Sequence, residues 1–306
     1  QSALSGRAAS NLEEVTGTSF DYSTNYYLLD RDGHHQQSVT VLSHTMHWDA
    51  GWYIRIINGE YADPESAASV FFPVFPVAVQ AVKIASLHTL GDASAGLVVN
   101  TVALFFALWA LMGIADIFFK GDKSQRKKLL ILFLTFPTAV FCHFFYSEAI
   151  FCALAFWSYL FALRREWWKV GLTLAILTAT RSTAILFVLL AGLEFMRAYD
   201  WKLKKILNPN ILWFLLAPSG LLLFSLYLYF VRGDPIAMIG GFHLTNDWAY
   251  HKLNFNFFYP YYLSLAEIKR VVNGSLPFDT YKIINHVMPA IMVLLTFIAS
   301  LYAIVK

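Results

Sequence analysis

The clearest candidate for chemistry is a carboxylic acid set among aromatic rings. The segment 47–61 reads HWDAGWYIRIINGEY and contains Asp49 with three aromatic neighbours, Trp48, Trp52 and Tyr53. Aromatic rings provide stacking faces for a sugar, and a carboxylate can take a proton from a hydroxyl group. This pattern indicates general-base chemistry on a sugar. The alternative is an aromatic belt at a membrane interface, with an acid at the start of a helix.

A second carboxylic acid, Glu148, closes the sequence YSE, which separates two apolar runs. Its carboxylate could hydrogen-bond a substrate beside Tyr146. Alternatively, Ser147 and Glu148 could cap the helix that begins there, because a hydroxyl group and an acid both stabilise a helix N-terminus. The sequence leaves both alternatives open.

Two arginines are candidates for binding a phosphate group. Arg181 lies in the sequence TRST, and Arg232 opens the sequence RGDP. A guanidinium group is planar and always charged, and it binds phosphate through two parallel hydrogen bonds. The alternatives are an internal ion pair of Arg181 with Glu148 or Asp49, and an Arg232 that only extends towards the membrane surface.

The composition is that of a membrane protein. Of the 306 residues, 58% are hydrophobic and only 14% are charged, whereas a soluble domain carries about 25% charged residues. The net charge of +3 is too small to indicate a nucleic-acid partner. The sequence has no Walker loop, no dinucleotide-binding glycine pattern and no HExxH motif. An activated substrate would therefore have to arrive through the membrane.

The two cysteines, Cys142 and Cys152, both lie in apolar runs. Two cysteines of this spacing predict neither a disulfide framework nor a metal site. We therefore interpret them as small buried apolar side chains.

The long apolar runs predict an all-α polytopic membrane protein. In chain order they occupy residues 94–119, 129–145, 149–163, 170–180, 183–195, 211–231 and 287–305. The short loops at 120–128, 164–169 and 197–205 are rich in Lys and Arg. Such loops remain in the cytoplasm, so the other ends of the helices face outwards.

This alternation divides the chain into three parts. Residues 1–70 form an extracytoplasmic first loop that carries Asp49, and residues 91–306 form a transmembrane bundle of about seven crossings with an outer loop at 232–286. Only one crossing fits between residues 70 and 120. We therefore expect residues 71–90 to form an amphipathic helix on the outer surface, entered through the structural turn FFPVFP.

Arg181 lies in the middle of the region 166–196. An arginine at the centre of a lipid-exposed helix costs several kcal/mol, and both flanks of this region are basic. We therefore predict a hairpin of two short helices with Arg181 at its tip. Each arm would span roughly 17–21 Å of a hydrocarbon core ~30 Å thick, so the tip would lie below the outer surface in a protein-lined or watery cavity.

The motifs WDAGWY, GEY, FFPVFP, YSE, TRST and RGDP follow one another along the chain. In this order they resemble the GPI mannosyltransferase II (PIG-V) family, which includes bacterial and archaeal members. The resemblance implies a C-type glycosyltransferase fold, a helical bundle with a large first outer loop that carries surface helices. The residues that match the family's motifs are Asp49 as the essential acid, Phe72, Pro73, Pro76, Tyr146, Glu148, Arg181 and Ser182.

The resemblance also implies a reaction. The donor would be a polyprenyl or dolichyl phosphate mannose, and the acceptor a GPI-like glycolipid or another glycan. A β-linked donor that gives an α-mannoside requires inversion, with Asp49 as the base. Arg181, and Arg232 after it, would stabilise the leaving phosphate.

The remaining site residues are assigned to the substrates. Those expected to contact the sugar or its acceptor are Trp48, Trp52, Tyr53, Tyr146, Glu148 and Ser182. We assign no metal ligand and no required cofactor, and leave the use of a divalent cation open. The expected partners are the two substrates and the lipid bilayer.

The expected location is a multi-pass protein of a prokaryotic plasma membrane or of a eukaryotic endoplasmic reticulum membrane. The alternatives are a C-type transferase for another lipid-linked sugar, a secondary transporter and a scaffolding subunit. Because the chain begins with Gln1 and ends directly after an apolar run, we expect further helices before residue 1 and after residue 306.

Overall fold

The computed structural model describes most of the chain between the first loop and the end of the RGDP segment. The described residues are 45–46, 49–64 and 66–240, with isolated positions between 262 and 298. The chain divides into two compact units, Gln1–Asn246 and Asp247–Lys306, and the account below concerns the first. The expected loop residues 1–44, Trp48 and most of the outer loop 232–286 lie outside the described residues.

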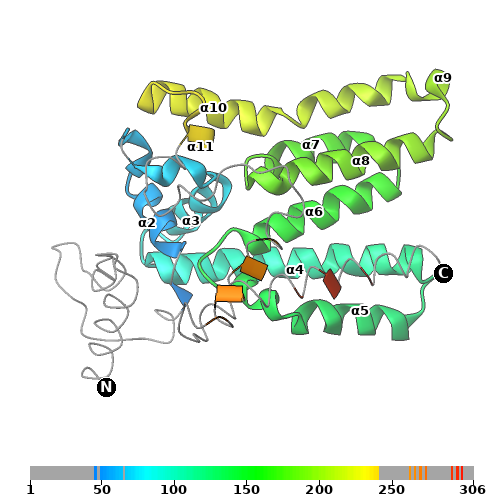
Figure 1. The fold of residues 1–306 in the computed structure, drawn as a ribbon, viewed down its shortest axis with the longest axis horizontal. Helices are drawn as coiled ribbons and strands as arrows, with labels where there is room; N and C mark the ends of the chain where they lie inside the picture. The colour runs from blue at the N-terminus through cyan, green and yellow to red at the C-terminus, as the bar shows by residue number, and fades with distance from the viewer. Residues whose placement is uncertain are drawn as a thin grey trace. The chain divides into compact units, whose positions relative to one another are not determined.

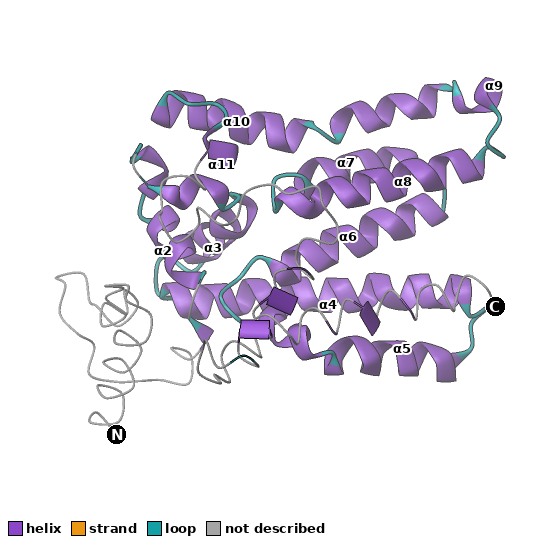
Figure 2. Ribbon diagram, viewed as in Figure 1, coloured by secondary structure: helices purple, strands orange, loops and turns teal. Residues whose placement is uncertain are grey.

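The described part of the chain is helical, as the apolar runs predict (Figure 2). Four short elements come first: α2 (Ala50–Ile57), η3 (Glu60–Ala62), η4 (Ala67–Val70) and α3 (Val74–Ala85). The remaining elements are α4 (Asp92–Phe118), α5 (Lys123–Thr135), η5 (Pro137–Cys142), α6 (Glu148–Leu163), α7 (Trp167–Leu177), η6 (Ser182–Ala184), α8 (Ile185–Ala198), α9 (Leu203–Ile206), η7 (Pro209–Leu216), α10 (Ser219–Arg232) and α11 (Ala237–Gly240). No strand occurs among the described residues.

The long helices lie side by side as a bundle, and small residues allow the close approaches (Figure 1). Helix α4 packs along α6 and buries a row of alanines, Ala103, Ala107 and Ala110. Helix α10 meets α7 at Gly220, where a Cβ atom would collide with the carbonyl oxygen of Ala175. A larger residue at Gly220 would therefore push α10 away from the bundle.

The basic loops share one end of the bundle. Figure 1 shows the α4–α5, α6–α7 and α8–α9 connections at the right, while α2 and α3 lie at the left. The right-hand connections carry Lys120, Arg164, Arg165 and Lys202. The basic connections are thus separated from α2 and α3 along the bundle, and the side of a membrane that each end faces stays a prediction.

Two described helices are long and apolar enough to cross a membrane by length and composition. They are α4 and the segment Pro209–Arg232, which joins η7 to α10. Helices α3, α6 and α7 are apolar but shorter. The seven crossings stay a prediction. Many leucines of α8 and α10 are exposed on the surface, among them Leu186 and Leu222.

The region 166–196 is a pair of helices, as the position of Arg181 predicts. Helix α7 ends at Leu177 and α8 begins at Ile185, with a turn and the short η6 between them. Both helices pack on α6 and lie next to each other in Figure 1. Arg181 itself has extended backbone angles, φ −160° and ψ 150°, and immediately precedes η6.

Helix α3 occupies most of the segment expected to form a surface helix. Phe75 and Val79 are fully buried on one face, whereas Val77 and Ile84 are exposed. The helix is therefore amphipathic in the structure, and its position at a membrane surface stays a prediction.

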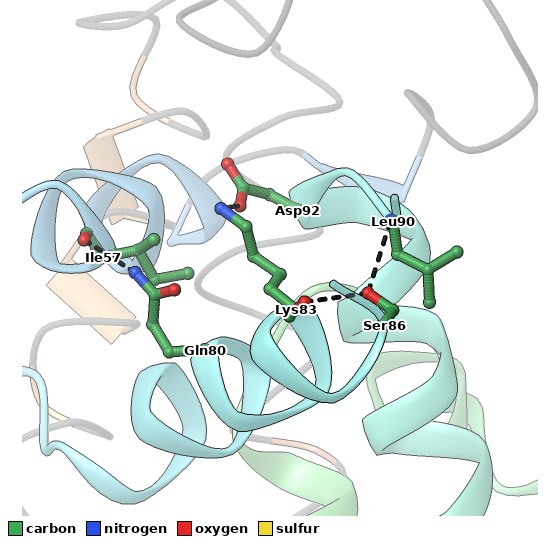
Figure 3. Close-up of polar contacts among 6 residues, drawn as sticks. All are labelled: Ile57, Gln80, Lys83, Ser86, Leu90 and Asp92. Atoms are coloured by element: carbon green, nitrogen blue, oxygen red, sulfur yellow. Dashed lines mark hydrogen bonds and ion pairs between the residues drawn. The ribbon is translucent and has the colours of Figure 1, made fainter. Parts of the chain in front are cut away.

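Polar contacts fasten α3 from its middle to its C-terminal end (Figure 3). The Lys83 Nζ lies 2.5 Å from the Asp92 Oδ1 at the start of α4, and the Gln80 Nε2 donates to the Ile57 carbonyl at the end of α2, 3.0 Å away. The hydroxyl of Ser86 donates to the Lys83 carbonyl and closes the helix. Helix α3 thus fixes α2 relative to the bundle.

Candidate functional site

Arg181 and Glu148 form an ion pair between the α7–α8 turn and the start of α6. The Arg181 Nη1 donates to the Glu148 Oε1 and lies 3.4 Å from the Ser147 Oγ. Both charged side chains are about a third exposed, at 37% and 29%. The sequence left two interpretations of Arg181 open, a phosphate-binding group and a partner in an internal ion pair, and the structure has the ion pair. It does not occupy the whole guanidinium, which has five N–H donors.

Ser147 connects this ion pair to helix α2. The Tyr53 hydroxyl donates to the Ser147 Oγ over 2.9 Å, and both side chains are buried. Ser147 precedes α6, yet its side chain makes no capping hydrogen bond. The Ser147 hydroxyl thus joins α2 to the start of α6 through its hydrogen bond from Tyr53. Glu148 occupies the first turn of α6, where the helix dipole favours a negative charge.

Asp49 stands at the start of α2 and faces the same charges. Its backbone carbonyl accepts from the Trp52 N–H at 3.1 Å, but its carboxylate does not cap the helix. Partial burial raises the pKa of the Asp49 carboxyl, the Glu148 carboxylate raises it further, and Arg181 lowers it. The side chain nevertheless keeps an exposed surface. An exposed carboxylate of raised pKa is a stronger proton acceptor than an ordinary aspartate.

These residues come from three separate parts of the sequence. We call Asp49, Tyr53, Ser147, Glu148 and Arg181 the Asp49 cluster. Burial raises the pKa of the Tyr53 phenol, which keeps it protonated as a hydrogen-bond donor. From the sequence, Ser147 was a candidate only for capping α6, and the hydrogen bond that it accepts from Tyr53 was missed.

The FFPVFP motif supplies the packing beneath the Asp49 cluster. The Tyr53 ring meets Phe71 and Phe75 edge-on at centroid distances of 5.4 and 5.0 Å, and Phe75 meets Phe145 at 5.0 Å. The Val74 N–H donates to the Ala179 carbonyl at 3.3 Å. The motif forms the turn that leads into α3, as predicted, and it also holds α2, the turn before α6 and the α7–α8 turn together, which was not predicted.

The other expected substrate residues have varied surroundings. The Trp52 ring stacks on Phe71 with a centroid distance of 5.7 Å. The Arg55 guanidinium lies 5.1 Å from the centroid of the Trp52 ring. Tyr146 is buried and stacks on Phe141, also at 5.7 Å. Ser182 is exposed at the start of η6. Their contacts with a substrate stay predictions, and Trp48 lies outside the described residues.

Arg232 belongs to a different set of contacts. Its Nη1 donates to the Ser66 carbonyl at 2.8 Å and its Nη2 donates to the Pro64 carbonyl. Nearby, the buried Ser69 hydroxyl donates to the Ala237 carbonyl at 2.9 Å. We call Pro64, Ser66, Ser69, Arg232 and Ala237 the Arg232 contact set.

The rest of RGDP forms a turn. Gly233 has a φ of 81°, which only glycine adopts readily, and the Asp234 Oδ1 accepts from the Ile236 N–H at 2.9 Å. Asp234 thus orders the start of the following loop. The structure places Arg232 on backbone carbonyls, and its phosphate-binding role stays a prediction.

Within the part of the chain that the structure describes, no three His, Cys, Asp or Glu side chains are grouped so that they could hold a metal ion.

Comparison with known families shows a match over most of the chain. The family described as Mannosyltransferase (PIG-V) matches residues 33–238, about two thirds of the chain. The match includes Asp49, Glu148, Arg181 and Arg232 and confirms the resemblance seen in the motifs. No curated protein and no solved structure matches the chain.

Proposed function

Because the chain belongs to the mannosyltransferase (PIG-V) family, we propose that it transfers mannose from a polyprenyl or dolichyl phosphate mannose to a hydroxyl group of a glycolipid or another glycan. Family membership makes it a glycosyltransferase. The donor, the acceptor, the side of the membrane and the inversion are the proposal.

The observation that carries the proposal is the Asp49 cluster. It combines a proton acceptor of raised pKa with a guanidinium group that is paired with Glu148 and whose charge acts on the same carboxyl group. Transfer from a lipid phosphate requires these two groups. One activates the acceptor hydroxyl, and the other stabilises the phosphate that leaves.

In the proposed reaction, the Asp49 carboxylate takes the proton of the acceptor hydroxyl. The acceptor oxygen then forms a bond to the anomeric carbon of mannose from the face opposite the phosphate. The bond between this carbon and the phosphate oxygen breaks, and the electron pair leaves with the phosphate. The attack inverts the configuration, as in an inverting glycosidase with a sugar hydroxyl in place of water.

Arg181 is proposed to stabilise the charge on the leaving phosphate. The ion pair with Glu148 fixes the guanidinium position through Nη1, and further N–H groups can meet phosphate oxygens. Arg232 remains the second candidate, although its contacts with Pro64 and Ser66 would have to be shared or released. Phosphate is already a good leaving group, so charge stabilisation matters more than protonation.

The proposed site faces the extracytoplasmic or lumenal side of a multi-pass membrane protein. The basic connections lie at the opposite end of the bundle from α2 (Figure 1), and such loops remain in the cytoplasm. The site would then meet a donor lipid whose phosphate is on the outer side. The host membrane is a prokaryotic plasma membrane or a eukaryotic endoplasmic reticulum membrane.

The test is transfer in isolated membranes from radiolabelled lipid phosphate mannose, with mass analysis of the product. We expect Asp49→Asn to retain membrane insertion and to lose roughly 10²–10⁴-fold in transfer rate, the usual contribution of a general base. The matched control is Glu60→Gln, an acid of the same segment that pairs with Arg55 at 3.9 Å and should change little. Wild-type transfer in Asp49→Asn would remove Asp49 as the base.

The same assay addresses the other functions. Transfer from a lipid phosphate carrying another sugar, with none from the mannose donor, would indicate a different sugar specificity. Movement of label across the membrane without a new glycosidic bond would indicate a transporter.

A further inference from the structure

Cys142 and Cys152 are neighbours in the structure although they belong to different elements. Cys142 is the last residue of η5, Cys152 begins the second turn of α6, and η5 packs on α6. The Cys152 thiol donates a hydrogen bond to the Cys142 Sγ. The chain has no other cysteine. The tertiary contact therefore supplies a pairing of thiols that the spacing in the sequence does not predict.

A cavity of about 540 Å³ gives access to both thiols. It lies between α4, α5, η5 and α6, and both cysteines line it. Leu132 and Phe136 in its lining are 63% and 44% exposed, so the cavity reaches the surface. Its volume is within the range of ligand pockets, about 300–1,000 Å³, and admits a small neutral reagent. Sulfur atoms that border a cavity also have space to rotate towards each other, which a close-packed interior does not provide.

The segment between the two cysteines carries part of the Asp49 cluster. Residues 143–151 include Ser147 and Glu148, which contact Tyr53 and Arg181 respectively. Glu148 precedes Cys152 by four residues, so the two share one face of α6, and Glu148 also lines the cavity. A bond between the two sulfurs would close a short loop around the turn that begins α6.

We propose that Cys142 and Cys152 form a reversible disulfide that closes the loop 142–152 around this turn. The inference goes beyond the proposed function and does not depend on it, because a sulfur–sulfur bond needs no mannose transfer. Disulfides persist in oxidising compartments outside the cytoplasm. The turn contacts α2, and this end of the bundle is the one proposed to face outwards.

The oxidant is a small neutral disulfide. One cysteine, as its thiolate, attacks a sulfur of the reagent, and the other half of the reagent leaves as a thiolate. The second cysteine then attacks the resulting mixed disulfide at the protein sulfur, and the remaining half of the reagent leaves in the same way. In sum the two cysteines lose two protons and two electrons, and the reagent is reduced to two thiols.

The test is the mass of the chain before and after oxidation. The protein is held in phosphatidylcholine nanodiscs and treated with 2,2′-dipyridyl disulfide, free thiols are alkylated, and the peptides are identified by mass spectrometry. We expect the chain to lose two hydrogen atoms, Cys142 to be joined to Cys152, and dithiothreitol to restore both thiols. A mixed disulfide that persists on either cysteine, a bond between two chains, or thiols that react only after unfolding would each overturn the proposal.

A shifted pair of thiols provides the matched control. Cys152→Ala combined with Ala153→Cys keeps two thiols but moves one of them by roughly 100° around α6. Because a disulfide requires a specific geometry, we expect its bond to form at least about tenfold more slowly than in the original chain. Equally fast formation in both chains would show that the thiols meet through general motion, and the pairing would fall.

Thermal unfolding tests whether the bond fits the turn. A disulfide that closes a short loop without strain should raise the melting temperature of the oxidised chain by roughly 5 °C over the reduced chain. Cys142→Ala and Cys152→Ala should each unfold at the same temperature under oxidising and reducing conditions. An oxidised chain that unfolds at or below the temperature of the reduced chain would show that the bond distorts the turn, and would overturn the proposal.

Discussion

The two arginines of the candidate site are used in different ways. Arg181 donates to a carboxylate side chain, Glu148, whereas Arg232 donates to the backbone carbonyls of Pro64 and Ser66. A phosphate can replace or join a carboxylate, because both are anions that accept from the same N–H groups. Backbone carbonyls hold a loop in place and are costly to leave without a donor. The Asp49 cluster therefore resembles a ligand-binding site. The Arg232 contact set instead holds a loop in place.

The largest expected difference separates Arg181→Lys from Arg232→Lys. Lysine keeps the charge but lacks the planar fork. We expect Arg181→Lys to lower kcat by about 10²-fold, the usual cost of losing one preorganised donor, with little loss of stability. For Arg232→Lys we expect a lower melting temperature in detergent and a small change in kcat.

The measurement is kcat together with thermal unfolding for both variants. An Arg232→Lys variant that loses as much kcat as Arg181→Lys, at unchanged stability, would contradict the comparison. It would indicate that Arg232 binds the phosphate, which is one of the two roles considered for Arg232 from the sequence.

Ser147 gives a smaller effect, because it positions other groups. Its hydroxyl accepts from Tyr53 and lies 3.4 Å from Arg181. We expect Ser147→Ala and Tyr53→Phe each to lower transfer several-fold, since a hydrogen bond of this kind contributes about 1 kcal/mol. The double variant should lose little more than either single one, because both remove the same bond. Fully additive losses would show that the two hydroxyls act independently.

The position of the Asp49 cluster could be predicted from the sequence to a large extent. Asp49, Glu148 and Arg181 stand in short polar segments between apolar runs, and the basic loops assign these segments to one end of the helices. The cost of an arginine in lipid also predicts the break in 166–196, which the structure has between Leu177 and Ile185.

Other features depend on tertiary packing and could not be predicted. The Tyr53–Ser147 hydrogen bond joins residues 94 positions apart, and no local pattern records it. The partners of Arg232 are backbone carbonyls, which look alike at every position of a sequence. The position of both cysteines on one cavity likewise follows from the approach of η5 to α6, which their spacing does not reveal.

The pH dependence of transfer provides a finer test of the Asp49 cluster. Asp49 accepts a proton only when ionised, so kcat/KM should rise with pH through its pKa. Burial and the Glu148 carboxylate raise this pKa, and Arg181 lowers it. Glu148→Gln removes one raising cause and keeps the lowering one, so the acid limb should move to lower pH.

The control is Asp116→Asn, which removes a carboxylate paired with Arg126 at the basic end of the bundle. It should leave the acid limb in place. An acid limb that stays unchanged in Glu148→Gln would mean that the titrating group is not Asp49.

The smallest effect on transfer is expected from a change at Ser69, which tests whether the Arg232 contact set has a purely structural role. The Ser69 side chain is fully buried, and its hydroxyl donates to the Ala237 carbonyl at 2.9 Å. Ser69→Ala leaves this carbonyl without its donor and should lower stability by about 1–3 kcal/mol, with kcat unchanged. Ser225→Ala is the matched control, because Ser225 donates to the neighbouring Pro235 carbonyl at a more exposed position and water can replace its hydroxyl. A kcat that falls in Ser69→Ala while stability holds would mean that the Arg232 contact set takes part in the reaction rather than fastening the loop.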